Sequence, residues 1–197
     1  MASLIGVRTA FVMFLALVLQ VCLFARTPVF GVTPEVVLLT TIGIALIGGP
    51  ERGAIAGFVG GFVFDCTVTT PFGMSALVYA SVGYVVGGLQ YAVLGSTWYT
   101  PLFVAGIASA LGTLAYGILG GLAGNFDWLT PRLVLVAFIV GLLNTGLAVV
   151  GLPITRWSQG EPLGLSALKV PEFLTRRRYR NRRAVRTRRH RPQRGGW

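Results

Sequence analysis

The chain has 197 residues, 54% of them hydrophobic, and its mean hydropathy is +0.72. These values exclude an ordinary soluble domain and are typical of a polytopic membrane protein. The net charge of +11 comes from one end, because residues 1–155 carry four arginines and four carboxylates, whereas residues 156–197 carry thirteen basic and two acidic side chains. We expect a membrane domain over 1–155, a juxtamembrane segment over 156–175 and a disordered, arginine-rich cytoplasmic tail over 176–197.

The first predicted helix is an apolar run over residues 9–25, which follows Arg8 and contains Gln20. The run is longer than the apolar part of a usual signal peptide, and no small-residue cleavage site follows it, so we expect a retained membrane helix. Short apolar helices are predicted over 35–47 and 53–65, separated by a Gly-Gly-Pro sequence. Both are shorter than the roughly 20 residues of a full membrane span.

Three longer helices are predicted after residue 71. One begins after the turn at residues 71–73 and runs to about residue 94, and the others cover 102–122 and 133–152. Six membrane segments, four long and two short, place both ends of the chain on one side of the membrane, and the basic tail favours the cytoplasm. The expected fold class is an all-α integral membrane protein of about six transmembrane helices.

Three amide side chains lie within the predicted helices. Gln20, Gln90 and Asn144 are each expected to hydrogen-bond a neighbouring helix, an interaction worth about 1 kcal/mol in a membrane. Contact with a bound ligand is the alternative for each of them. Cys22 and Cys66 are far apart and lack paired spacing, so they predict neither a disulfide nor a metal site.

Glycines at four-residue spacing mark the most informative stretch. Gly53, Gly57, Gly61 and Asp65 share one face of a helix, since four residues advance about 400° around its axis. Small residues let membrane helices approach closely, so another helix is expected to lie against this face. A carboxylate at membrane depth suggests a functional site. The structural alternatives are that Asp65 caps the helix after the turn or lies in an aqueous vestibule.

The tail holds eleven arginines within residues 176–194, a block that repels itself. Near an anionic inner leaflet each arginine contributes about 1 kcal/mol, so anionic lipid is the first expected partner and an acidic protein the second. Nucleic acid is the least favoured, because Tyr179 is the one Phe, Tyr or Trp ring in the block that could stack on a base. The arginines are Arg176, Arg177, Arg178, Arg180, Arg182, Arg183, Arg186, Arg188, Arg189, Arg191 and Arg194.

The sequence has none of the common catalytic motifs. His190 in the tail is the only histidine, and Lys169 is the only lysine. No Gly-x-Ser-x-Gly, His-Glu-x-x-His or phosphate-binding loop is present. We therefore predict that the protein is not an enzyme and holds no cofactor and no metal.

The order and spacing of residues between Pro34 and Val86 resemble the family of the rod shape-determining protein MreD. The residues that carry the resemblance are Pro50, Gly57, Phe58, Gly61, Asp65, Gly73, Ala76 and Leu77, with Asn144 in the last helix. The resemblance covers about residues 5–157, and the arginine tail departs from the usual short ending of the family. It implies a non-enzymatic protein of the bacterial cell membrane, with a fold similar to the substrate-binding subunits of energy-coupling vitamin transporters.

The resemblance also implies partners in the bacterial elongation complex. MreC is the implied direct partner, which binds through its membrane helix. The protein is also implied to link MreB indirectly to the peptidoglycan polymerase and transpeptidase. We hypothesise that the glycine-bearing face forms a groove for the MreC helix. The residues assigned to this groove are Gly53, Gly57, Gly61, Asp65, Pro71 and Gly73.

The alternative function is that of a substrate-binding subunit of an energy-coupling vitamin transporter. Such subunits dock through an Ala-x-x-x-Ala pattern on their first helix. The alanines of the first helix here, Ala10, Ala16 and Ala25, lack this spacing. Stabilisation of the purified protein by a vitamin would favour this alternative.

Overall fold

The computed structural model describes residues 2–24, 31–68, 72–94, 97, 99–124 and 130–160, and the regular elements found there are helices. The chain divides into the units Met1–Gly164 and Leu165–Trp197, and the second unit lies outside the described residues, as does the predicted arginine tail. The elements are α1 (Ala2–Val18), the π-helical η1 (Leu19–Phe24), α2 (Val36–Gly48), α3 (Pro50–Asp65), α4 (Met74–Gly88), α5 (Gln90–Leu94), α6 (Thr100–Leu122) and α7 (Pro131–Ser158).

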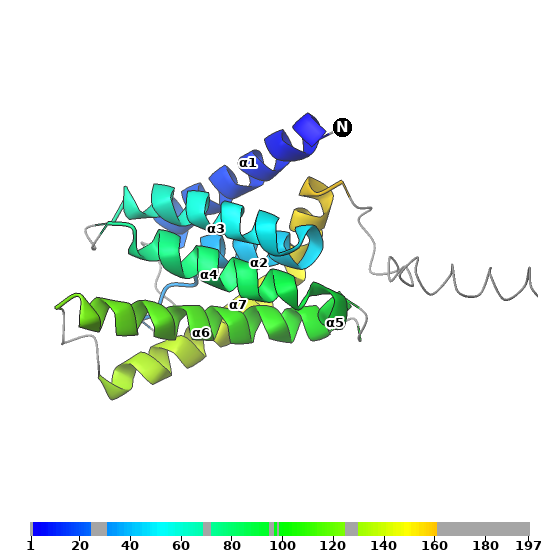
Figure 1. Ribbon diagram of the computed structural model, residues 1–197. Helices are drawn as coiled ribbons and strands as arrows, with labels where there is room; N and C mark the ends of the chain where they lie inside the picture. The colour runs from blue at the N-terminus through cyan, green and yellow to red at the C-terminus, as the bar shows by residue number, and fades with distance from the viewer. Residues whose placement is uncertain are drawn as a thin grey trace, which may run out of the picture. The chain divides into compact units, whose positions relative to one another are not determined.

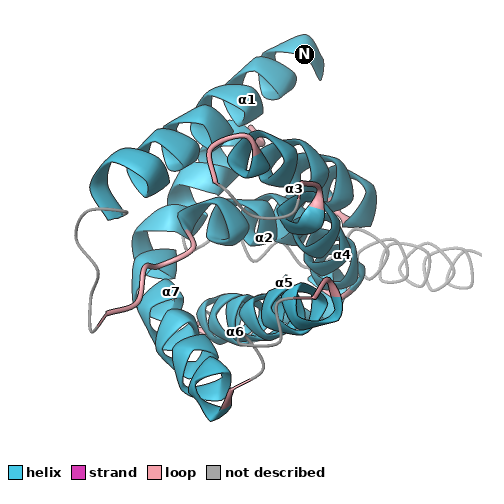
Figure 2. Cartoon of the chain, turned by 90° about the vertical axis from the view of Figure 1, so that its left-hand side faces the viewer, coloured by secondary structure: helices cyan, strands magenta, loops and turns pink. Residues whose placement is uncertain are grey.

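The short helix α2 lies at the centre of the bundle. Every residue from Val37 to Leu46 is buried, and α2 packs against α1, α3, α4, α6 and α7. Figure 2 shows α2 enclosed by these helices. Its sequence is apolar on all sides, which is the pattern of a helix surrounded by others. The predicted range of 35–47 differs from the observed one by a single residue at each end.

Helices α3 and α4 form a closely packed antiparallel hairpin (Figure 1). A Cβ atom built on Gly53 would lie 2.5 Å from the carbonyl oxygen of Gly83, and one built on Gly61 would lie 2.5 Å from that of Ser75. Between them, a Cβ on Gly57 would meet the backbone of Tyr79. Each step of four residues along α3 is therefore matched by a step of four back along α4, and the glycines set both the register and the short distance between the two backbones.

Within the residues that the structure describes, three helices are long and apolar enough to cross a membrane, Leu4–Phe24, Thr100–Leu122 and Pro131–Ser158, and α2 and α4 are shorter apolar helices. The prediction of four long segments is wrong, because the fourth helix is interrupted at Leu89. Its amide bonds back to the carbonyl oxygens of Val85 and Val86 before α5 begins. The Gly-Gly pair just before Leu89 has low helix propensity, which makes an interruption there inexpensive.

The last helix is longer than predicted. α7 continues through Pro153 to Ser158, beyond both the predicted helix end at residue 152 and the expected domain boundary at residue 155. A proline removes one backbone hydrogen bond, but a membrane helix that packs against neighbours tolerates this loss. The segment expected to be juxtamembrane therefore begins as the final turn of α7.

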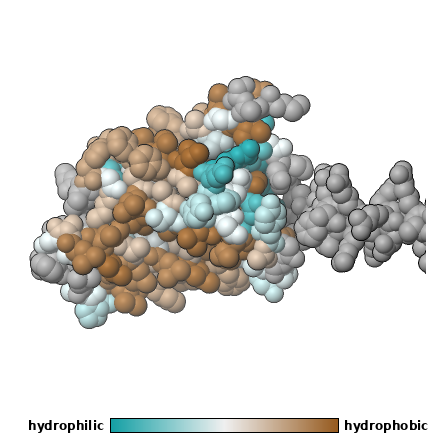
Figure 3. Space-filling model, viewed as in Figure 1, coloured by the Kyte–Doolittle hydropathy of each residue, from teal (hydrophilic) through white to brown (hydrophobic). Residues whose placement is uncertain are grey.

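The outside of the bundle is apolar over most of its area. Figure 3 shows hydrophobic residues over nearly all of one side, with a hydrophilic patch near the end at which α3 begins. Large side chains such as Phe11, Ile107 and Phe138 are each more than half exposed. This surface suits contact with lipid.

The close α3–α4 contact predicts opposite effects of alanine at two glycines. Gly57→Ala should lower the unfolding midpoint of the detergent-solubilised protein, because the added Cβ meets the Tyr79 carbonyl oxygen, and overpacking of this kind costs about 1 to 3 kcal/mol. Gly146→Ala in α7 is the matched control, since nothing lies within 4 Å of its Cβ position and alanine favours the helix. Thermal unfolding followed by tryptophan fluorescence measures both, and equal midpoints would contradict the packing.

Candidate functional site

The first turn of α2 lies at the level of the midpoints of two long helices. α6 and α7 have 23 and 28 residues, so they are about 35 and 42 Å long, whereas the 13 residues of α2 extend only about 20 Å. Ser109 and Asn144 lie near the midpoints of α6 and α7 and are linked to each other and to the start of α2. In a membrane no water reaches that depth, so the free backbone groups of the α2 N-terminus need partners from the protein.

Two amides hydrogen-bond the start of α2, and Gln20 supplies the partner of one free N–H group. The Oε1 atom of Gln20 accepts a hydrogen bond of 2.9 Å from the backbone N–H of Val37. The Nδ2 group of Asn144 donates to the carbonyl oxygen of Glu35 at 3.1 Å and to the hydroxyl of Ser109 at 2.9 Å. Gln20 and Asn144 thus hydrogen-bond neighbouring helices, as we expect from the sequence. Both form a hydrogen bond with the backbone at the start of α2.

Further polar side chains gather at the same place. Thr113 shares its hydroxyl proton between the Ser109 carbonyl oxygen at 3.0 Å and the Glu35 carboxylate at 3.5 Å. The Tyr79 side chain is buried and lies near that of Gln20. We call this set the polar cluster. Its members are Gln20, Glu35, Tyr79, Ser109, Thr113 and Asn144.

Two acceptors of the polar cluster have no hydrogen-bond partner in the part of the chain that the structure describes. They are the Oε2 atom of Glu35 and the Oδ1 atom of Asn144, and both atoms are buried. The cluster can therefore accept further hydrogen bonds from a donor that enters it. From the sequence, Glu35 is predicted only to begin a short helix. The signal that could have identified it is a lone acid before an apolar helix too short to span the membrane.

The glycine-bearing face of α3 is covered. The expectation that another helix lies against it is met by α4 of the same chain, whose backbone packs against Gly53, Gly57 and Gly61. The hypothesis that these glycines form an open groove for the MreC helix is therefore wrong. A partner could reach them only if α4 left its place.

Asp65 caps the helix that follows the turn. Its carboxylate accepts hydrogen bonds from the backbone N–H groups of Gly73 at 2.9 Å, Ser75 at 3.2 Å and Ala76 at 3.3 Å, and only 2% of its surface is exposed. Gly73 has a φ of +92°, a left-handed conformation that favours glycine. Of the structural alternatives, capping is the observed one, and Asp65 joins the end of α3 to the start of α4. Pro71 lies outside the described residues.

The remaining predicted site residues have lesser roles. Gln90 begins α5, and its buried carbonyl oxygen faces Gly49 without a hydrogen-bond donor among the described residues, so the interhelical bond expected of this atom is not made. Cys22 and Cys66 are exposed free thiols. No group of three His, Cys, Asp or Glu residues that could hold a metal ion occurs within the described ranges.

An all-helical bundle with three helices able to span the membrane and a polar cluster among its helices defines a multi-pass membrane protein. The model of the family described as rod shape-determining protein MreD matches residues 2–143, and the chain belongs to this family. Neither the curated proteins nor the solved structures gave a significant match. Family membership assigns the protein a role in determining rod shape, and the family is not one of known enzymes.

The polar cluster predicts a stability effect at Asn144. Asn144→Leu removes both hydrogen bonds that the amide donates, one to the Ser109 hydroxyl and one to the Glu35 carbonyl oxygen, so the free energy of unfolding should fall by about 1 to 2 kcal/mol. Leu142→Ala, in the same helix but 65% exposed, should change it far less. Thermal unfolding in detergent compares the two variants, and a larger loss for Leu142→Ala would refute the assignment.

Proposed function

We propose that the protein is a non-enzymatic membrane scaffold of the bacterial elongation complex. In this proposal it binds MreC in the cell membrane and helps to couple MreB to the peptidoglycan polymerase and transpeptidase. The observation that carries the proposal is the family match over residues 2–143, which covers most of the helical bundle. The arginine tail stays a predicted site for anionic lipid or an acidic partner, outside the described residues.

A ridge of phenylalanines on the outside of α3 supports a partner-binding role for that face. Phe58, Phe62 and Phe72 are 54%, 42% and 64% exposed. The rings of Phe58 and Phe62 lie 6.2 Å apart, and those of Phe62 and Phe72 lie 5.0 Å apart edge to face. Rings already held by one another lose little conformational entropy on binding. We propose this ridge, in place of the covered glycine face, as the surface that receives the MreC helix.

Alanine substitutions test the ridge. The pair Phe58→Ala and Phe62→Ala should reduce co-purification of MreC with the tagged protein by at least about tenfold, because exposed aromatic anchors carry much of the energy of an interface. The matched control is the pair Phe103→Ala and Phe138→Ala, which removes two rings that are more exposed, at 58% and 67%, from α6 and α7. The bound MreC is quantified against the amount of tagged protein in the membrane.

Two results would count against different parts of the proposal. Unchanged co-purification with the ridge variant would exclude the ridge and leave MreC binding intact. Absence of MreC from the unmodified protein, under conditions that preserve the elongation complex, would exclude the direct partnership itself.

We also propose that the end of the bundle carrying Arg8, Arg52 and Arg156 faces the cytoplasm. The Arg8 guanidinium lies 5.2 Å from the ring of Trp157, and Arg52 hydrogen-bonds Gln159 at 3.3 Å, so these groups meet at the end of α7. Arg132 lies at the other end of the same helix, about 36 Å away. An excess of arginine marks the cytoplasmic side of membrane proteins.

A reporter fused to the C-terminus tests this orientation. Green fluorescent protein fused there should fluoresce, and alkaline phosphatase fused at the same point should be inactive. An active phosphatase with a dark fluorescent protein would reverse the orientation.

A further inference from the structure

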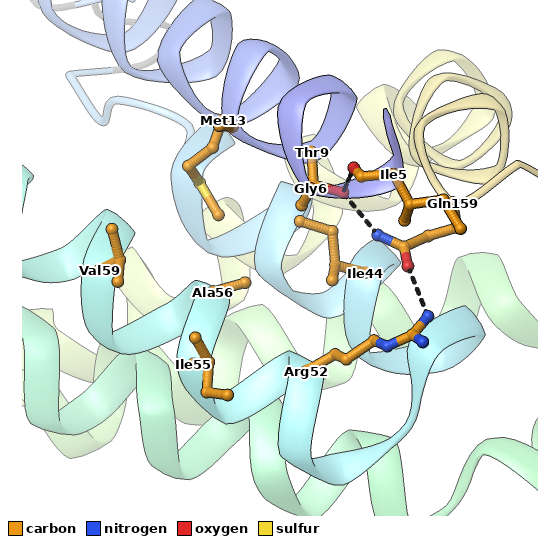
Figure 4. Close-up of a pocket in the computed structure, with 11 residues that line it drawn as sticks. Ile5, Gly6, Thr9, Met13, Ile44, Arg52, Ile55, Ala56, Val59 and Gln159 are labelled. Atoms are coloured by element: carbon orange, nitrogen blue, oxygen red, sulfur yellow. Dashed lines mark hydrogen bonds between the residues drawn. The ribbon is translucent and has the colours of Figure 1, made fainter. Parts of the chain in front are cut away.

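A groove between α1 and α3 is open on one side of the bundle and has a volume of about 470 Å³ (Figure 4). Its walls are almost entirely apolar. Ile5 and Met13 of α1 and Ile55 and Val59 of α3 form its sides, with Ile44 of α2 among the residues that line it. The volume lies in the range of small-molecule sites, which is about 300 to 1,000 Å³.

One end of the groove is polar. The Nη1 group of Arg52 donates to the Oε1 atom of Gln159 at 3.3 Å, and the Nε2 group of Gln159 donates to the Thr9 hydroxyl at 2.9 Å (Figure 4). Thr9 in turn donates to the carbonyl oxygen of Ile5 at 2.8 Å. This chain of hydrogen bonds joins α3, the end of α7 and α1, and it holds the guanidinium group at the rim of the groove.

Arg52 makes no ion pair with a carboxylate among the described residues, and it donates a hydrogen bond to the neutral amide of Gln159. Its aliphatic stem lies against the end of α2, where a Cβ on Gly48 would come within 2.9 Å of the Arg52 Cδ atom. Among the described residues, Gln159 occupies one of the five N–H donors of the guanidinium group, so the others can bond an anion that approaches the rim. Phosphate is an anion that arginine binds with good geometry.

The polar end lies at the depth of lipid headgroups. Arg52 is in the first turn of α3, Ile5 in the first turns of α1, and Gln159 directly after α7. From there the groove runs about 10 to 12 Å along the two helices, to Met13 and Val59. One leaflet of the hydrocarbon core is about 15 Å deep. The groove therefore has one charged end at the membrane surface and one apolar end within the leaflet.

From this arrangement we infer that the groove binds one phospholipid with an anionic headgroup, its phosphate at Arg52 and the upper part of one acyl chain between α1 and α3. Basic pockets between membrane helices suit such headgroups. A transmembrane helix fits less well, since it needs a contact of about 30 Å and gains nothing from an unpaired arginine at one end. The groove shares no residue with the polar cluster, and the inference does not depend on the proposed function.

Photolabelling of the full-length protein tests the inference. The protein is placed in phosphatidylcholine nanodiscs that contain a minor fraction of phosphatidylglycerol with a photoreactive group in its acyl chain, and labelled peptides are identified by mass spectrometry. We expect labels around Met13 and Val59. Arg52→Gln should lower this labelling about fivefold, the factor expected for one arginine at an anionic surface. Arg52→Lys keeps the charge and should retain most of it.

Two control variants separate the groove from the rest of the surface. Arg132→Gln removes an exposed arginine at the other end of the bundle and should leave the labelling unchanged. Ala10→Trp fills the groove from α1 and should abolish the labelling, whereas Val7→Trp, at a residue 68% exposed and outside the groove, should not.

Three results would overturn the inference. Equal labelling by a photoreactive phosphatidylcholine would show a surface without headgroup recognition. Unchanged labelling of Arg52→Gln would exclude Arg52 as the phosphate ligand. Absence of lipid labels, with crosslinks from the groove to a co-purified protein, would assign the groove to a partner helix.

Discussion

The start of α2 inside the bundle is the constraint on which the rest of the structure depends. A helix that begins at mid-membrane has free N–H groups where no water can bond them, and each unpaired group there is expensive. Gln20 of the first long helix accepts from one of these N–H groups, and Asn144 of the last long helix donates to the carbonyl oxygen of Glu35 at the same end of α2. Ser109 and Thr113 lie beside them in α6. Polar residues are therefore gathered in the middle of the bundle, and α1, α6 and α7 are held around one short helix.

The hairpin of α3 and α4 solves a different problem, which is how two short helices stay together in lipid. Their glycines bring the backbones into contact, and Asp65 joins the two ends through three backbone N–H groups. Because this contact is internal, the smooth face of α3 is not available to other proteins. What α3 presents outward instead is a row of phenylalanines and one wall of the groove beside α1.

Polar, charged and apolar side chains thus occupy different parts of the bundle. Uncharged hydrogen-bonding groups and one acid occupy the centre, Arg8, Arg52 and Arg156 lie at one end with Arg132 at the other, and apolar side chains cover the outside that meets lipid. The scaffold role proposed for this member of the MreD family would need such an outside surface more than an internal chemical site. The groove between α1 and α3 interrupts this apolar surface with a hollow that has one polar end at Arg52.

Composition and local pattern alone determined that the protein is an all-α membrane protein. They also gave the bounds of α2 and α6 to within two residues and showed that Gly53, Gly57 and Gly61 lie close to another helix. Only the tertiary structure decided which helix covers those glycines and that the carboxylate of Asp65 caps α4. It also decided that Glu35 lies among polar side chains and that Arg52 hydrogen-bonds Gln159, which is 107 residues away in the sequence. The physical reason is that spacing along a helix shows which face must be close to something. In lipid, all apolar neighbours are nearly equivalent, so the choice among them rests on backbone fit and hydrogen bonds that form only when the whole bundle is assembled.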